Sequence, residues 1–184
     1  MVQLPEISNI QEFVLSNPLL VGVLVVIIYV GVAWQRSLGY RQYRMFHLLK
    51  TGAFRVLDGR FTKLGRPLIH PKHRPEDSRE YLTTIDAPPR VVFQRFREAG
   101  ASPHLIASTK SRPGPDGGTQ YTHSQLVYIW GDGTQTEYYL FTDGDGKADV
   151  YGHNETAVLD PEGHVSDGIT PAKHLPDGYE EPTE

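Results

Sequence analysis

The chain has 184 residues, no cysteine and a formal net charge of −4. The absence of cysteine excludes disulfides, thiolate nucleophiles and cysteine-ligated metal centres. The charge is unevenly divided, because residues 36–74 carry ten Lys or Arg and one acid, whereas residues 75–184 carry eight Lys or Arg and nineteen acids. A nucleic-acid-binding domain needs a basic face, so this acidic second part argues against nucleic acid as a partner.

Residues 13–35 contain no charged side chain and are mostly Val, Ile and Leu. A helix over residues 13–34 would be about 33 Å long, close to the hydrocarbon thickness of a bilayer. A cleaved signal peptide needs a basic leader, but the preceding residues hold Glu6 and Glu12 and no Lys or Arg. We therefore expect a retained transmembrane helix at residues 13–35, preceded by a short extracytoplasmic segment at residues 1–12.

The basic residues that follow this segment predict its orientation. Lys and Arg close to a span are retained on the cytoplasmic side, so the N-terminus is expected outside and the rest of the chain in the cytoplasm, at the cell (inner) membrane. Trp34 and Arg36 at the end of the span, with Arg41 and Arg44 just beyond, are the predicted interfacial anchor residues.

Residues 36–58 predict a basic juxtamembrane helix. Leu38, Met45, Leu48 and Leu49 lie near one stripe at helical spacing. Two interpretations stay open, that the stripe rests on the inner headgroups or that it packs on a partner subunit. Residues 59–79 contain several prolines and are expected to form an extended linker.

A small α+β domain is predicted at residues 80–166, with an antiparallel β-meander packed on one helix. A strand is expected at residues 81–85, a helix from a cap at Asp86 to Gly100, and a strand at residues 104–109. The meander strands are expected within residues 121–130, 135–142 and 148–155, because Asp-Gly turns separate these runs. A last hairpin is expected at residues 156–165, and the acidic, Pro-rich tail at residues 167–184 is expected to be extended or disordered.

Residues 84–93, Thr-Ile-Asp-Ala-Pro-Pro-Arg-Val-Val-Phe, join the first strand to the helix. This run resembles the opening of helix-grip domains of the START and polyketide-cyclase type. The resemblance implies a curved sheet that holds a helix over an apolar ligand cavity. It covers about a dozen residues, and no site residue of the family carries over to this chain.

The candidate chemical groups are few. Asp143, Asp145 and Asp149 resemble a calcium-binding loop, although a solvated hairpin turn is the favoured interpretation. His104, His123 and His153 lie in or beside predicted strands, where an acid such as Glu137 or Asp149 would face them. No nucleophile or phosphate-binding motif accompanies them, so we expect histidines satisfied within the fold, no catalytic residues and no cofactor.

Aromatic side chains are concentrated on the meander. Alternation along the strands sends some of them away from the helix-packed face, which makes Tyr128, Trp130, Tyr138 and Tyr139 candidates for a protein-binding surface. The alternative is cross-strand pairing that stabilises the sheet.

Together these features predict a non-enzymatic, single-pass membrane-anchored accessory or assembly subunit. Its expected partners are the lipid bilayer and other protein subunits of a membrane complex. An alternative is a juxtamembrane module that binds an apolar ligand in a helix-grip-like pocket. More distant alternatives are a viral or prophage envelope protein and a hydrolase or metal enzyme that uses the histidines and Asp143 to Asp149.

Overall fold

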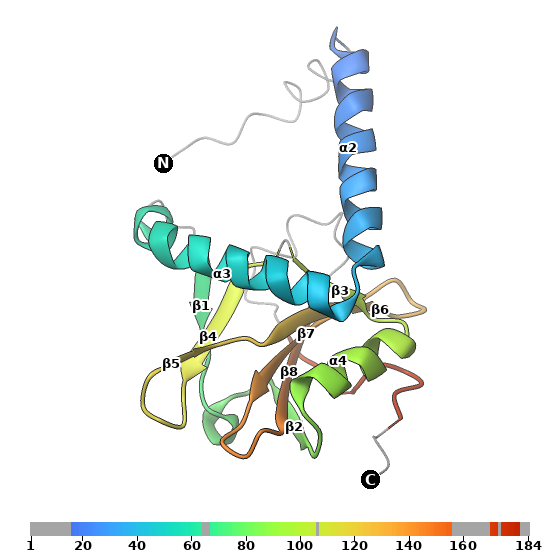
Figure 1. The fold of residues 1–184 in the computed structure, drawn as a ribbon. Helices are drawn as coiled ribbons and strands as arrows, with labels where there is room; N and C mark the ends of the chain where they lie inside the picture. The colour runs from blue at the N-terminus through green and yellow to red at the C-terminus, as the bar shows by residue number, and fades with distance from the viewer. Residues whose placement is uncertain (1–15, 64–66, 106, 156–169, 173, 181–184) are drawn as a thin grey trace. The chain divides into compact units, whose positions relative to one another are not determined.

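The computed structural model describes residues 16–63, 67–105, 107–155, 170–172 and 174–180 (Figure 1). The chain divides into two compact units, Met1–Ser37 and Leu38–Glu184. The predicted N-terminal segment at residues 1–12, the first three residues of the predicted span and the hairpin at residues 156–165 lie outside the described residues.

The first unit contains one described long helix, α2, at Pro18–Ser37. Proline is tolerated in a first helical turn because its missing N–H would have no partner there. At the other end, the Ser37 hydroxyl donates a hydrogen bond to the Trp34 carbonyl at 2.7 Å. Its 20 residues carry a single charge, Arg36, in the last turn.

The second unit begins with helix α3 at Tyr40–Thr62. Gly39 is its N-cap, and the side-chain oxygen of Gln42 accepts a hydrogen bond from the Gly39 N–H at 3.1 Å. The helix runs through Gly52 and Gly59, so it ends later than the predicted boundary at residue 58. A glycine inside a helix costs only about 1 kcal/mol relative to alanine, which the packing of the inward face can offset.

The strands form two sheets (Figure 1). The three-stranded sheet has the order β1 (Ile69–Pro71), β4 (Thr109–Pro113), β5 (Thr119–Tyr121), with β1 parallel to β4. The six-stranded sheet has the order β2 (Tyr81–Ile85), β8 (Ala148–Glu155), β7 (Gln135–Thr142), β6 (Ser124–Ile129), β3 (Ser102–Pro103), and β9 (Thr170–Pro171) also pairs with β8. The antiparallel order β6, β7, β8 confirms the predicted meander.

Helix α4, at Pro89–Glu98, packs on strands β6, β7 and β8. Its buried side includes Val92, Phe93 and Phe96. Gly100 has φ of +98°, the left-handed conformation that commonly follows a helix C-terminus. The predicted cap at Asp86 is wrong, because Pro88 occupies the N-cap and the Asp86 carboxylate pairs with Lys147 at 3.0 Å.

The two faces of the six-stranded sheet differ in chemistry. Alternation along β7 sends Tyr138 and Leu140 toward α4, where both are fully buried in the main hydrophobic core. The opposite face carries Glu137, Tyr139 and Phe141, which are buried as well. The domain therefore has an apolar interior on one side of this sheet and a polar, aromatic interior on the other.

Several predicted boundaries change. The strand expected at residues 104–109 is replaced by β3, at Ser102–Pro103, and β4, which begins at Thr109. The expected linker at residues 59–79 contains β1 and a 3-10 helix, η1, at Pro75–Asp77. Asp58 at the end of α3 accepts hydrogen bonds from the N–H groups of Leu68 and Ile69 at 2.7 and 3.0 Å, which fixes this segment to the helix. The second unit consequently starts at Leu38 instead of residue 80.

The described part of the predicted tail is ordered against the domain. Beyond β9, Ala172 is buried, and the Tyr179 ring packs edge-on against Phe96 with centroids 5.2 Å apart. The His174 carbonyl accepts a hydrogen bond from the Tyr138 hydroxyl at 2.7 Å. The prediction of an extended or disordered tail is wrong for these residues, because a few apolar side chains among the acids cover the core.

Candidate functional site

Helix α2 is the described element that is long and apolar enough to cross a membrane. Its described apolar side chains are almost all exposed, unlike those of a helix in the core of a soluble domain. A signal sequence near an N-terminus can also form a helix that is long and apolar enough to meet this description. Length and composition therefore define a candidate span, and they do not define its orientation.

The predicted anchor residues fall into both units. Trp34 and Arg36 lie in the last turn of α2 and are exposed. Arg41 is exposed on α3. Arg44 is only partly exposed and donates a hydrogen bond to the carbonyl of His123, so the structure directs it into the domain instead of toward a surface. Burial lowers the pKa of the Arg44 guanidinium, which remains a cation.

A network of charged side chains fills the polar interior between the two sheets. Its centre is Glu137 on β7, which is 2% exposed. Across the strand pair, His153 Nε2 lies 3.3 Å from a Glu137 carboxylate oxygen, and Lys110 Nζ of β4 lies 3.4 Å from the same oxygen. The other oxygen accepts a hydrogen bond from Gln125 at 3.1 Å and lies 3.7 Å from His104 Nδ1.

The network extends from Glu137 to a second carboxylate, Glu80. His153 Nδ1 lies 3.2 Å from Glu80, so the imidazole ring stands between two acids. Lys72 pairs with Glu80 at 2.6 Å, and the Tyr139 hydroxyl donates a hydrogen bond to the same carboxylate. The sequence analysis expected histidines that meet acids across the sheet, and His153 beside Glu137 confirms this.

The electrostatics keep both acids ionised. Burial alone would raise the pKa of Glu80, but hydrogen bonds from His153, Lys72 and Tyr139 outweigh it and lower the pKa to about 2. The same competition, between burial on one side and Lys110, His153 and His104 on the other, brings the pKa of Glu137 well below its usual range. The charges in this interior are therefore compensated by one another, as buried ion pairs require.

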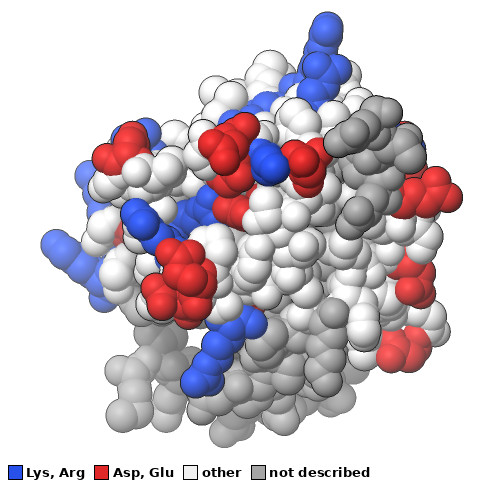
Figure 2. All heavy atoms as spheres, turned by 90° about the horizontal axis from the view of Figure 1, so that it is seen from below, with Lys and Arg blue, Asp and Glu red and all other residues white. Residues whose placement is uncertain are grey.

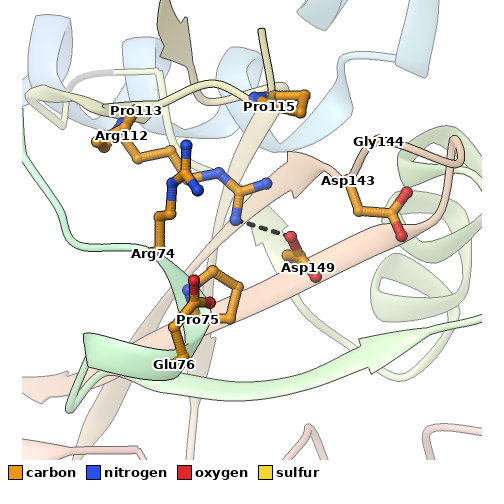
Figure 3. Close-up of a pocket in the computed structure, with 9 residues that line it drawn as sticks. All are labelled: Arg74, Pro75, Glu76, Arg112, Pro113, Pro115, Asp143, Gly144 and Asp149. Atoms are coloured by element: carbon orange, nitrogen blue, oxygen red, sulfur yellow. Dashed lines mark ion pairs between the residues drawn. The ribbon is translucent and has the colours of Figure 1, made fainter. Parts of the chain in front are cut away.

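A second ion pair forms the base of a pocket of about 180 Å³ (Figure 3). Arg112 of β4 pairs with Asp149 of β8 at 2.7 Å, and the two side chains are 4% and 5% exposed. Arg112 also donates hydrogen bonds to the Tyr151 hydroxyl and to the Thr142 carbonyl. Its guanidinium lies 4.6 Å from the centre of the Phe141 ring.

This pocket contains two members of the weak calcium candidate, Asp143 and Asp149. Figure 3 shows Asp143 on the hairpin turn and Asp149 directed at Arg112. Asp143 accepts hydrogen bonds from the N–H groups of Asp145 and Lys147 at 2.9 and 2.6 Å, as a hairpin turn does. Within the residues that the structure describes, no three His, Cys, Asp or Glu side chains are grouped to hold a metal ion. The arrangement supports a turn, because Arg112 already neutralises Asp149.

The four aromatic candidates separate into two pairs. Tyr138 and Tyr139 are fully buried, so the structure does not place them on a binding surface. Tyr138 packs under α4, whereas Tyr139 stacks on Tyr151 with centroids 5.5 Å apart, the cross-strand pairing considered as the alternative. Tyr128 and Trp130 remain partly exposed near the tip of the β6–β7 hairpin, with ring centroids 4.8 Å apart.

The sequence analysis did not identify the lysines of the network, Lys50, Lys72 and Lys110, or one of its acids, Glu80. Lys110 and Arg112 stand in a run of polar residues, Thr-Lys-Ser-Arg, which is typical of an exposed edge strand. Their spacing of two residues was the available signal, because it places both side chains on one face of a strand. Lys50, which donates hydrogen bonds to Gln125 and to the Ala107 carbonyl, looked like part of a basic helix surface.

No known protein family matches the chain, and neither a characterised protein nor a solved structure resembles it at a significant level. The resemblance of residues 84–93 to helix-grip domains therefore stays a prediction.

Proposed function

We propose that the protein is a non-enzymatic, single-pass membrane-anchored subunit whose cytoplasmic domain binds a protein partner. The observation that carries this proposal is α2, a 20-residue apolar helix that lies in a different compact unit from the domain. This arrangement is typical of a membrane anchor joined to a separately folded domain. The excess of Lys and Arg just after α2 supports an outside N-terminus and a cytoplasmic domain.

The interior of the domain supports a non-enzymatic role. Glu137 and His153, an acid and a base whose nearest atoms lie 3.3 Å apart, are each 2% exposed. Their partners are other side chains of the network, so a substrate has no direct approach to them. A general acid or base must reach its substrate within hydrogen-bond distance, which this burial prevents.

Binding of an apolar ligand under α4 is a weaker candidate. The space between α4 and the sheet is filled by side chains that are fully buried in the protein, namely Val92, Phe93, Phe96, Leu126, Tyr138 and Leu140. Phe96 packs edge-on against both Tyr138 and Tyr179, each at 5.2 Å between centroids. A ligand would have to displace these contacts.

The tip of the β6–β7 hairpin is the surface best suited to a protein partner. Ile129 is 53% exposed, between the partly exposed rings of Tyr128 and Trp130. Trp130 is held in place because its indole N–H donates a hydrogen bond to the Thr136 hydroxyl at 2.7 Å. A pocket of about 220 Å³, lined in part by Trp130 and His174, adjoins the tip. Rigid aromatic side chains beside a pocket are common in the energetically dominant part of interfaces.

The anchor and its orientation are tested with single cysteines, since the chain has none. Ser8→Cys and Gln94→Cys variants are expressed in cells, and an impermeant maleimide is added before and after permeabilisation. We expect carbonate-resistant membrane association, labelling of Cys at position 8 in intact cells, and labelling at position 94 only after permeabilisation. Release by carbonate, or labelling of position 94 in intact cells, contradicts the proposal.

The partner surface is tested by purification from detergent extract. The wild-type chain should recover a stoichiometric protein partner, and Ile129→Asp should reduce that recovery at least tenfold, because it places a charge in an apolar contact. Gln94→Asp, on the exposed side of α4, is the matched control and should leave recovery unchanged. Purification of the wild type as a lone monomer, or equal recovery with Ile129→Asp, argues against this surface.

A further inference from the structure

Helix α3 packs on the domain with a polar and aromatic face and turns an apolar stripe outward. Tyr43, His47 and Thr51 are buried on the inward face. The outward stripe consists of Met45, Leu48, Leu49 and Val56, which are 50, 54, 64 and 80% exposed. This is the reverse of the usual surface helix, whose apolar stripe faces the core. Leu38, expected in the same stripe, is instead buried.

Cations surround this stripe. Arg41, Arg55 and Arg60 are exposed on α3, and Lys63 follows its last turn. The helix contains one acid, Asp58, which is partly buried and bonded to the backbone of Leu68 and Ile69. The outward face of α3 therefore combines apolar and basic side chains and has no exposed acid. On the face seen from below, acidic and basic side chains are interspersed (Figure 2).

The connection between α2 and α3 is short, so a bilayer spanned by α2 lies close to the start of α3. Helix α2 ends at Ser37 and α3 begins at Tyr40, so two residues separate them. Two residues extend at most about 7 Å. The headgroup region on each side of the hydrocarbon core is about 5–7 Å thick. If α2 spans the bilayer, the first turn of α3 starts in or next to the headgroups.

We propose that the outward face of α3 lies on an anionic lipid surface. Met45, Leu48, Leu49 and Val56 would enter the boundary between headgroups and acyl chains, and the cations around them would contact lipid phosphates. An apolar stripe bordered by Lys and Arg is the pattern of helices that lie in the plane of the interface. The inference rests on the proposed function, because it requires α2 to be the anchor. The outward face of α3 is then a second binding surface of the domain. Its contact with lipid fixes which side of the domain faces the bilayer.

The test uses the full chain in vesicles of phosphatidylcholine with about one third phosphatidylglycerol, a composition chosen to supply anionic charge. Single cysteines replace Val26 on α2, Leu49 on the outward face of α3 and Gln94 on α4, and each is labelled with an environment-sensitive fluorophore. Nitroxide-bearing lipids then report contact with the bilayer. We expect quenching at position 26 by deep nitroxides and at position 49 by shallow ones, with a water-like signal at position 94.

The outcomes separate this inference from the anchor itself. A lipid signal at position 26 with a water-like signal at position 49 overturns the α3 proposal and leaves the anchor intact. A water-like signal at both positions overturns the proposed function too. A label at position 49 that is shielded from water but not quenched by lipid nitroxides means that a protein covers the stripe, which also overturns the proposal.

The role of charge is tested in the Leu49→Cys background. Combined Arg41→Gln, Arg60→Gln and Lys63→Gln changes should reduce quenching at position 49 at least twofold in anionic vesicles. The matched control combines Arg74→Gln, Arg79→Gln and Arg97→Gln, which removes three cations outside α3 and should leave quenching unchanged. Full quenching in the first variant, or an equal loss in both, contradicts binding of anionic lipid by α3.

Discussion

At the scale of single residues, Glu137 shows how this domain uses buried charge. A carboxylate without partners would be protonated at this depth, yet Lys110, His153 and His104 keep its pKa low despite burial. These partners come from β4, β8 and the segment after β3, so one acid joins elements that are distant in sequence. Such pairs contribute little net stability compared with apolar packing, but removal of one partner is costly.

Glu137→Gln is therefore expected to lower the free energy of unfolding by about 3–5 kcal/mol, because Lys110 and His153 would be left buried without their shared acid. Chemical denaturation of residues 38–184 measures the change. Glu98→Gln is the control: this acid pairs with Arg95 at 3.1 Å on the surface, where loss of an ion pair costs about 0–1 kcal/mol. Similar losses for the two variants would contradict a structural role for the buried network.

The histidines on the inner side of α3 predict a dependence of stability on pH. Burial lowers the pKa of His47 to about 3, and the nearby cations Lys50 and Arg44 act in the same direction, whereas the hydrogen bond that the His47 ring donates to the Thr122 carbonyl opposes them. Burial likewise lowers the pKa of His123 to about 4, again with Arg44. The unfolded chain binds these protons near pH 6.5 and the folded chain does not. Stability supplied by the neutral rings is therefore present above pH 6.5 and lost as the pH falls toward 4 and 3.

We expect the unfolding free energy to fall between pH 7 and pH 5 by up to about 1.4 kcal/mol per pH unit for each histidine. His47→Gln should flatten this slope without abolishing it, because His123 still titrates. Urea denaturation at pH 7, 6 and 5 measures both chains. The pKa of Glu80 is lowered to about 2, so its contribution to the unfolding free energy is lost only as the pH falls below its ordinary pKa near 4.5. Glu80 therefore does not account for a change between pH 7 and pH 5. Equal slopes in the two chains would contradict a buried neutral His47.

At the scale of elements, the sequence predicts structure well where local chemistry decides it. The turns at Gly133 and Gly146 adopt positive φ, so the Asp-Gly signals correctly separate β6, β7 and β8. Prediction fails where distant contacts decide. The sequence predicts helix α3 but not that its inward face packs on the domain, because the hydrogen-bond partners of His47 and Tyr43 lie 75 and 82 residues away. Only the fold brings Lys110 and Glu137 together, so the network could not be assembled from sequence spacing.

Two glycines, Gly100 just after α4 and Gly52 inside α3, are expected to change the stability of the domain in opposite directions when replaced by alanine. Gly100 ends α4 with φ of +98°, so Gly100→Ala should destabilise the domain by about 1 kcal/mol through backbone strain. Gly52 lies inside α3, exposed, and an added Cβ meets nothing within 4 Å. Gly52→Ala should stabilise the domain by up to about 1 kcal/mol, because alanine favours the helix. Thermal unfolding measures both, and changes of the same sign would contradict the described helix boundaries.

At the scale of the whole molecule, the structure changes the interpretation of the uneven charge along the chain. The basic stretch at residues 36–74 was predicted as a helix and a linker that separate the anchor from the domain. In the structure its described residues from Leu38 onward belong to the domain itself, since the second unit begins at Leu38 and includes α3 and β1. Lys50 and Lys72 of this stretch enter the buried network, where they meet Gln125 and Glu80 of the acidic part. Part of the charge asymmetry is thus compensated inside the fold, and another part remains on the outward face of α3.

This organisation predicts where the chain can be cut. The described hydrophobic core contains Leu38 and Tyr43 and no residue before them. A chain of residues 38–184 should therefore unfold in one cooperative transition and show native circular dichroism. Residues 80–184, the domain and tail predicted from the sequence, should not fold alone. The shorter chain lacks Tyr43, whose hydroxyl oxygen accepts a hydrogen bond from the Gln125 N–H at 2.7 Å, and it lacks Lys72, which pairs with Glu80. A cooperative transition in residues 80–184 would show that α3 is an accessory to the domain, and failure of residues 38–184 to fold would show that α2 is required for it.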